Sequence, residues 1–262
     1  MPRPTDYRPL SCGACAQGAG LGFDISMAFQ PIVNTLNGEI YSHEALVRGV
    51  RNEPAAEVFE RVNKDNLYRF DQTCRVKAIK LAAELGISTL LNVNFMPNAV
   101  YRPELCIRTT LEAAEEYGFP TSRIVFEITE SEYVNDLPHL RTIVTDYQGR
   151  GFLVAIDDFG AGHSGLNLLA DLRPDVVKLD MCLIRDISGD KARQVICKGM
   201  VQICRELGMT VIAEGVETGD ELSCLQDIGI HLFQGYYLAR PSFESLAQIN
   251  PAALASPGHQ LS

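Results

Sequence analysis

The sequence predicts an α/β fold, a (β/α)8 barrel in which the first strand runs antiparallel to the other seven. Short apolar runs alternate with segments of helical spacing along most of the chain, as in a parallel sheet whose strands are joined by helices. Eight such runs, with a crossover helix after all but the first, suit a closed barrel. The first two runs are joined through Asn37-Gly38, a dipeptide typical of tight hairpins, and are therefore expected to be antiparallel.

Each predicted strand is a compact apolar run, and each predicted helix has apolar residues at helical spacing. The strands are expected at residues 27–33, 40–47, 89–94, 124–129, 153–156, 176–179, 210–214 and 231–234. The helices are expected at residues 71–85, 103–117, 138–147, 166–172, 192–207 and 220–227. A glycine at or just beyond the last turn marks the end of four helices, at Gly86, Gly118, Gly208 and Gly229.

The barrel is expected to be the one folded domain of the chain. Residues 1–25, rich in Pro, Gly and Ala, are interpreted as a flexible tail or linker; residues 26–250 form the barrel, and residues 251–262 form a C-terminal tail. No internal repeat is evident, and no domain boundary follows residue 25. An open doubly wound sheet is the alternative, although the glycine-rich phosphate fingerprint usual in that fold is missing from the sequence.

Charge and hydropathy limit the classes of partner. A net charge of −10 and a pI near 5.0 argue against polymeric nucleic acid and against an anionic membrane. A small anionic substrate stays compatible with this charge, because bound metal ions reverse the local field. No apolar run approaches the ~18 residues of a membrane span and no signal-peptide core opens the chain, so a cytoplasmic location is expected.

The cysteines divide into two groups. Cys12 and Cys15 form a C-x-x-C in the N-terminal tail, for which a zinc or redox role and incidental thiols remain alternatives, because no second pair completes a site. The other six lack paired spacing and are expected to be reduced, packed thiols: Cys74, Cys106, Cys182, Cys197, Cys204 and Cys224.

Polar residues stand where the predicted strands end. The strand at 153–156 is followed by Asp157 and Asp158, two adjacent carboxylates that repel each other unless a cation lies between them. In a barrel the strand ends gather on one face. The residues expected there are Glu44, Asn94, Glu127, Asp157, Asp158, Lys178, Glu214 and Gln234, joined by Gln30 from the reversed first strand. Five carboxylates against one lysine predict a site for two divalent cations.

The ligand types indicate which metal and which chemistry. Oxygen ligands, and five histidines without i, i+4 pairing, favour Mg²⁺ or Mn²⁺ over zinc. Two ions sharing Asp157 can activate a water and hold a phosphodiester for in-line attack. A Schiff base on Lys178 is the weighed alternative. Because surrounding carboxylates keep a lysine charged, orienting water or balancing charge suits Lys178 better.

An ordered set of motifs resembles one family. The signature E-A-L-x-R stands at residues 44–48 (EALVR). Around it stand QPIV at 30–33, Asn94, EITE at 127–130, DDFGAG at 157–162, KLD at 178–180, AEGVE at 213–217 and QGY at 234–236. Over about residues 26–243 the chain resembles EAL-domain cyclic di-GMP phosphodiesterases. The sequence of several segments is most similar to the EAL domains of BLUF photoreceptor proteins.

The resemblance implies a role for each site residue. The first metal would be held by Glu44, Asn94, Glu127 and Asp157, and the second by Asp157, Asp158 and Glu214. The catalytic group comprises Glu44, Lys178, Glu214 and Gln234, of which Lys178 and Gln234 would hold the attacking water. Substrate contacts would come from Gln30, Arg48, Asp180 and Glu217. Glu130 would anchor the loop after Asp158, because residues i and i+3 at a strand end diverge and can hardly ligate one ion together.

The implied activity is hydrolysis of cyclic di-GMP to linear pGpG with two Mg²⁺ or Mn²⁺ ions. The alternative is a catalytically weak EAL domain that acts as a cyclic di-GMP receptor or a protein-interaction module. By analogy with the family, a homodimer through residues 166–172 is expected, since this stretch carries four leucines, more than a single core-facing stripe requires. The alternative is that these leucines belong to the core of the barrel and its loops. A sensor domain or signalling protein is a further expected partner. His163 and Phe95-Met96 depart from the family's usual residues without removing a ligand.

Overall fold

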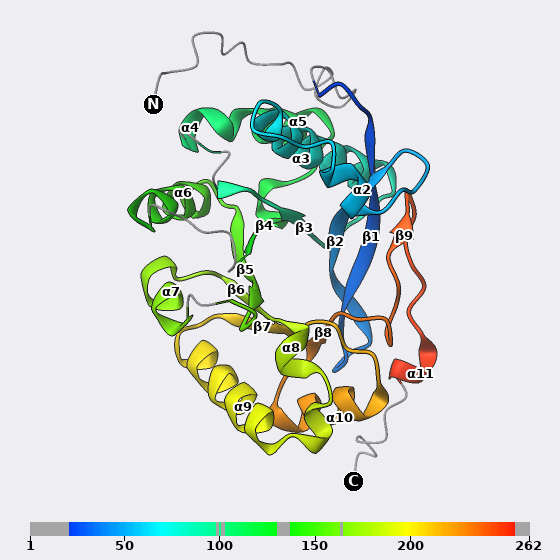
Figure 1. Ribbon diagram of the computed structural model, residues 1–262, viewed down its shortest axis with the longest axis vertical. Helices are drawn as coiled ribbons and strands as arrows, with labels where there is room; N and C mark the ends of the chain where they lie inside the picture. The colour runs from blue at the N-terminus through cyan, green and yellow to red at the C-terminus, as the bar shows by residue number, and fades with distance from the viewer. Residues whose placement is uncertain (1–20, 98–99, 101–102, 130–136, 163–164, 255–262) are drawn as a thin grey trace.

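The computed structural model describes residues 21–97, 100, 103–129, 137–162 and 165–254. The first two strands, β1 (Ile25–Asn34) and β2 (Glu39–Gly49), form a long antiparallel hairpin (Figure 1). The turn between them is built as the sequence predicts: Gly38 has a φ of 73°, and the side chain of Asn37 accepts a hydrogen bond from the Glu39 backbone N–H at 3.0 Å.

The remaining barrel strands follow one another around the sheet in sequence order. They are β3 (Leu90–Asn94), β4 (Ile124–Thr129), β5 (Leu153–Phe159), β6 (Val176–Leu179), β7 (Thr210–Ala213) and β8 (Leu232–Phe233). Neighbours from β2 to β8 are parallel, and β1 closes the barrel by pairing antiparallel with both β2 and β8. The predicted barrel with a reversed first strand is therefore confirmed.

Helices join the parallel strands and cover the outside of the barrel (Figure 1). They are α2 (Ala55–Phe59), α3 (Leu67–Glu84), α4 (Pro103–Cys106), α5 (Arg108–Glu116), α6 (Leu137–Gly149), α7 (Gly165–Leu172), α8 (Met181–Ile184), α9 (Lys191–Glu206) and α10 (Gly219–Ile228). Local chemistry sets several of their ends. Thr218 and Glu221 form a reciprocal capping box on α10, and Gly229 ends that helix with a φ of 104°.

The barrel interior has an apolar lower layer and a polar upper layer. Six buried side chains fill the lower part, one each from β1 and β4–β8: Ile32, Val125, Ala155, Val176, Ile212 and Leu232. A larger apolar core lies between the strands and the surrounding helices. Buried polar residues occupy the carboxyl ends of the strands, so the apolar layer forms a water-free floor beneath them.

Several short elements were not predicted from the sequence. The helix expected at 103–117 is two helices, α4 and α5. No element was predicted in the segments that form α2, α8 and the 3-10 helices at Thr121–Arg123 and Ile187–Gly189. A further strand, β9 (Ser242–Phe243), pairs with β1, and α11 (Pro251–Leu254) places Ala253 in the core. Elements of two to five residues carry too little periodicity to be recognised. Among the helices that the structure describes, none has the length and apolarity needed to cross a membrane.

Candidate active site

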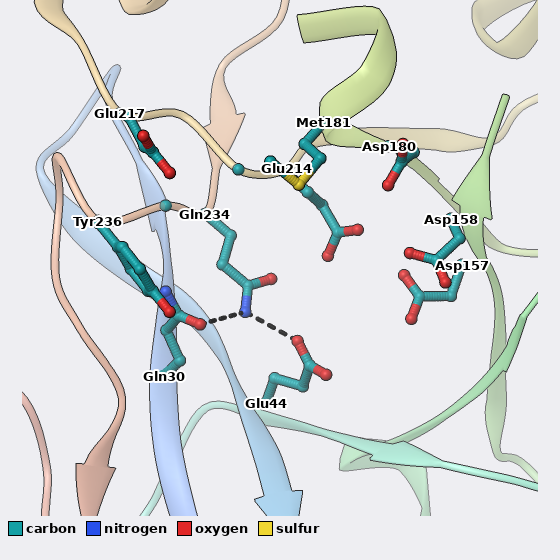
Figure 2. A pocket seen from close by; sticks show the side chains of 12 residues that line it. Gln30, Glu44, Asp157, Asp158, Asp180, Met181, Glu214, Glu217, Gln234 and Tyr236 are labelled. Carbon is teal, nitrogen blue, oxygen red and sulfur yellow. Dashed lines mark hydrogen bonds between the residues drawn. The ribbon is translucent and has the colours of Figure 1, made fainter. Parts of the chain in front are cut away.

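The carboxyl ends of the strands surround a pocket of about 340 Å³. Eight of the predicted site residues line it: Gln30, Glu44, Asp157, Asp158, Asp180, Glu214, Glu217 and Gln234. Figure 2 shows the carboxylates of Asp157, Asp158 and Glu214 pointing into a common space above Glu44. The residues come from β1, β2 and β5 and from the segments just after β6, β7 and β8, so the strand-end placement expected from the sequence is what brings them together.

Lys178 lies at the floor of this site and is fully buried. Its Nζ is 2.6 Å from Glu127 Oε1 and 2.7 Å from Glu214 Oε1. It also lies 3.0 Å from Asp157 Oδ1 and 3.3 Å from Glu44 Oε2. One ammonium group thus contacts carboxylates from four different strands or strand ends, which partly offsets the cost of burying them.

The electrostatics of the pocket follow from burial and from crowding of like charges. Burial raises the pKa of Glu127 well above its usual range, and the Glu44 charge adds to the effect. Burial, followed by the charge of Asp157, likewise raises the pKa of Glu214 well above its usual range. Burial alone would lower the pKa of Lys178, but the surrounding carboxylates, Asp157 foremost, raise it well above the ordinary value. The lysine therefore stays charged, which argues against the Schiff-base alternative.

Two groups of carboxylates are arranged to hold metal ions. In the first, Glu44, Glu127 and Asp157 place one oxygen each within 4.8 Å of one another; in the second, Asp157, Asp158 and Glu214 do the same. Asp157 belongs to both groups. The buried Glu127 Oε2 and Gln234 Oε1 have no hydrogen-bond donor among the described residues. Carboxylate-rich donor sets with free oxygens fit hard divalent cations.

Amide side chains hold the glutamates of the site. The Nε2 group of Gln234 donates to Glu44 Oε2 at 2.7 Å and to Gln30 Oε1 at 3.2 Å (Figure 2). Asn94 donates to Glu44 Oε1 at 3.0 Å, and Asn92 donates to Glu127 Oε1 at 2.8 Å. Asn92 was not predicted as a site residue. It lies inside β3 rather than at its end, and the signal that could have found it is an amide flanked by apolar residues two positions before Asn94.

The rim of the pocket carries both predicted and unpredicted residues. Asp180 caps α8 by accepting from the Cys182 N–H at 2.8 Å, and Glu217 pairs with Arg185 at 2.7 Å. The ring of Tyr236 lines the pocket, and the guanidinium carbon of Arg240 lies 4.1 Å from its centroid. Tyr236 was quoted only as part of a motif, and Arg240 was not singled out. An exposed aromatic with a cation on its face is visible only once the chain is folded.

Arg48 is not among the residues that line this pocket. It lines a second hollow of about 410 Å³ together with Glu44, Asn94 and apolar side chains of α2 and α3. Its Nη1 donates to the Val47 carbonyl at 2.7 Å. Burial lowers the pKa of Arg48, and the nearby charges of Tyr236 and Glu44 oppose that effect. Glu130, His163, Cys12 and Cys15 lie outside the described residues, so the predicted loop anchor is not described here.

Comparison with known proteins identifies the relatives of this chain. It is 28% identical over 223 residues, 85% of its length, to the blue light- and temperature-regulated antirepressor BluF of Escherichia coli (strain K12), which bears out the predicted likeness to BLUF-EAL proteins. It is 31% identical over 163 residues, 62% of its length, to the cyclic di-GMP phosphodiesterase PA2567 of Pseudomonas aeruginosa. The matches cover 55% and 26% of those relatives, so the chain spans about half their length or less.

Solved structures with the same fold give the same family. A standalone EAL protein from Vibrio cholerae O395 in its c-di-GMP-bound form has a TM-score of 0.86 and 54% identity, covering 90% of this chain and 99% of that one. A Klebsiella pneumoniae BlrP1 complex with manganese and c-di-GMP has a TM-score of 0.83 and 34% identity, covering 87% of this chain and 58% of that one. The sequence profile of the EAL domain matches residues 20–241. The chain belongs to the EAL domain family.

Proposed function

We propose that this protein is a cyclic di-GMP phosphodiesterase that opens the substrate ring to linear 5′-pGpG. The observation that carries the proposal is the pair of carboxylate groups that share Asp157 at the floor of the pocket. Two such groups suit a pair of divalent ions beside a single phosphodiester. Family membership supports the same substrate, since the V. cholerae and K. pneumoniae structures are complexes with this dinucleotide.

Mg²⁺ or Mn²⁺ is the proposed cofactor, with two ions in each site. Glu44, Asn94, Glu127 and Asp157 would hold one ion; Asp157, Asp158 and Glu214 would hold the other. When bound, these ions supply Lewis acidity at the phosphate and lower the pKa of a bound water. A complex of K. pneumoniae BlrP1 with manganese supports this choice.

The residues of the chain then bind and orient the reactants. Lys178, whose raised pKa keeps it charged at neutral pH, and Gln234, whose Oε1 has no hydrogen-bond partner among the described residues, would hold the attacking water. Water adds to one phosphorus of the substrate, and the bond from that phosphorus to the ribose 3′ oxygen breaks. One proton of the water ends on the released 3′ oxygen, so the products are a terminal 5′ phosphate and a free 3′ hydroxyl. Because an ammonium that stays protonated cannot accept a proton, Lys178 acts as a hydrogen-bond donor rather than as the base.

Substrate recognition is assigned to four polar residues. Gln30, Asp180 and Glu217 line the pocket, where they can accept or donate hydrogen bonds to a guanine or a ribose. Arg48 lies beside Glu44 and is the proposed phosphate contact. We also propose the barrel of residues 26–250 as the catalytic domain, a cytoplasmic location, and regulation by a sensor domain or signalling partner.

The direct test is a product assay with the purified protein. We expect pGpG to appear by chromatography and mass spectrometry when cyclic di-GMP is added with Mg²⁺ or Mn²⁺, and no product in EDTA. The matched control is Asp171→Asn, which removes an exposed carboxylate of α7 away from the pocket and leaves turnover unchanged. Binding of cyclic di-GMP without turnover under either metal would contradict the proposed activity.

A receptor or interaction module is the second candidate function. The observation that favours it is the similarity to BluF, whose name describes an antirepressor. Isothermal titration in EDTA tests binding of cyclic di-GMP, and product analysis after Mg²⁺ or Mn²⁺ is added separates the two candidates. A receptor binds the dinucleotide and leaves it intact, whereas the proposed enzyme converts it once metal is added.

A further inference from the structure

Asn92 is a buried amide in the interior of the barrel, one layer below the pocket. Its side chain is 1% exposed, and it lies on β3 in register with Glu44 of β2 and with Val125 of β4. Most other residues of β3 are apolar, and an amide at this depth costs free energy unless it makes hydrogen bonds. The residue therefore needs a partner inside the barrel.

That partner is Glu127. Asn92 Nδ2 donates to Glu127 Oε1 at 2.8 Å, and Lys178 Nζ lies 2.6 Å from the same oxygen. The other oxygen, Glu127 Oε2, is buried and has no hydrogen-bond partner in the described part of the chain. Two donors on one oxygen and none on the other fix the rotation of the carboxylate, because turning it would break both contacts.

The two asparagines of β3 donate hydrogen bonds to glutamates on the two strands that flank β3. Asn94 reaches to Glu44 on β2, while Asn92 reaches to Glu127 on β4. Both glutamates belong to the first of the two carboxylate groups, which they form together with Asp157. One strand thus supports ligands on each of its neighbours, and a neutral amide does so without adding charge to an already acidic site.

We propose that Asn92 is a positioning residue for Glu127, holding Oε1 in place so that the free oxygen faces the ion of the Glu44–Glu127–Asp157 group. This inference rests on the proposed function, because it assumes that the carboxylates bind metal. Asn92 does not line the pocket, and its proposed effect on the metal site passes through Glu127. Its removal is expected to weaken one of the two metal sites and to leave the other unchanged.

The test is direct Mn²⁺ binding to substrate-free protein, followed by the electron paramagnetic resonance signal of the free ion. We expect the wild type to bind two Mn²⁺ ions. Asn92→Leu removes the donor at similar size and is expected to bind one ion normally and the other about 10-fold or more weakly. The matched control is Ser42→Ala, which removes the hydroxyl of another fully buried polar residue. This variant is expected to bind Mn²⁺ as the wild type does.

Turnover separates a positioning role from damage to the fold. In Asn92→Leu, saturating Mn²⁺ is expected to restore kcat, with KM for cyclic di-GMP unchanged and with normal thermal unfolding in EDTA. If Asn92→Leu does not fold, Asn92→Ser is measured in its place. Two ions bound with wild-type affinity in the folded variant overturn the role of Asn92 alone. A wild-type protein that binds no Mn²⁺ overturns the proposed metal chemistry as well.

Discussion

Asp158 combines two features that are costly for an aspartate. Its backbone has a φ of 54°, and burial followed by the charge of Asp157 raises its pKa to about 6. The pKa of Asp158 in the folded protein thus exceeds the ordinary aspartate value of 3.8. The proton is bound more tightly by the folded state, so the stability that this group contributes is present below pH 3.8 and lost as the pH rises through 6.

Asp158→Asn is therefore expected to stabilise the metal-free protein in a pH-dependent way. The amide removes the like-charge repulsion and tolerates the left-handed backbone. In EDTA, thermal unfolding should show a larger gain in Tm at pH 7.5 than at pH 5. Asp171→Asn, on the exposed face of α7, is the control, with no such difference. An equal gain at both pH values would assign the effect to backbone strain alone.

Glu44→Gln removes the charge of the signature glutamate and one of its two acceptor oxygens. The side chain keeps its size, but of the hydrogen bonds from Asn94 at 3.0 Å and from Gln234 at 2.7 Å it can accept only one. We expect turnover to fall by more than about 100-fold, which exceeds the usual effect of losing a residue that only supports a ligand. Thermal unfolding in EDTA should change little, because the lost hydrogen bond offsets the relief of crowding among the carboxylates. Turnover near the wild-type rate would remove Glu44 from the metal site.

Residues at strand ends were predictable from the sequence, whereas residues within strands were not. Asp157 and Glu127 interrupt or end apolar runs, and their placement at one face follows from parallel strands. Asn92 has the same chemistry, but its neighbour is set by the pleat and by the stagger between β3 and β4. Tyr236 and Arg240 meet only through the turn after β8, which no periodicity describes.

At the scale of elements, α3 is joined to the site by a buried ion pair. Arg75 Nη2 lies 2.6 Å from Asp71 Oδ2, and both side chains are 1% exposed. Asp71 Oδ1 accepts from the Met96 N–H at 3.1 Å, and Arg75 Nη1 donates to Thr110 Oγ1 at 3.0 Å. The pair thus connects α3 with the segment after Asn94 and with α5. The sequence predicted a helix from residue 71, but gave no sign that two charged residues would face the core.

Arg75→Met is expected to destabilise the fold by about 3–5 kcal/mol, because it leaves Asp71 buried without its cation. The double variant Asp71→Leu/Arg75→Met should cost less than Arg75→Met alone, as urea unfolding can measure. Arg150→Met provides the comparison, because Arg150 Nε lies 2.7 Å from Asp146 Oδ2 in an ion pair that is partly exposed to solvent. Its expected cost in the free energy of unfolding is about 0.5 kcal/mol. Strictly additive effects of the two core substitutions would show that Asp71 and Arg75 are not coupled.

At the scale of the whole molecule, fewer leucines of α7 are exposed for the predicted dimer contact than the four that the sequence offers. Of the four leucines of α7, Leu169 and Leu172 are buried, Leu168 is partly buried, and Leu166 is 53% exposed. A homodimer through α7 stays a prediction. Leu166→Glu should shift a micromolar sample from dimer to monomer in analytical ultracentrifugation. The control is Leu207→Glu, which changes an equally exposed leucine just after α9. A wild-type monomer at the same concentration would contradict the prediction.

Metal binding should also stabilise the barrel as a whole, because the proposed ligands belong to β2, β3, β4 and β5 and to the segment after β7. Each ion then joins strands that are distant in sequence and offsets the repulsion between their carboxylates. Above both dissociation constants, each tenfold rise in free Mn²⁺ adds about 1.4 kcal/mol per site to the free energy of unfolding, or about 2.8 kcal/mol for two sites.

Glu214→Gln provides the matched measurement, since Glu214 belongs only to the group formed with Asp157 and Asp158. Denaturant unfolding of this variant at a series of Mn²⁺ concentrations should give half the wild-type slope, about 1.4 kcal/mol per tenfold rise, because one site still binds. Equal slopes in the two proteins would mean that Glu214 holds no ion. A wild-type slope of only about 1.4 kcal/mol per tenfold rise would mean that the protein binds a single ion. Asp157 would then not be shared between two metal sites.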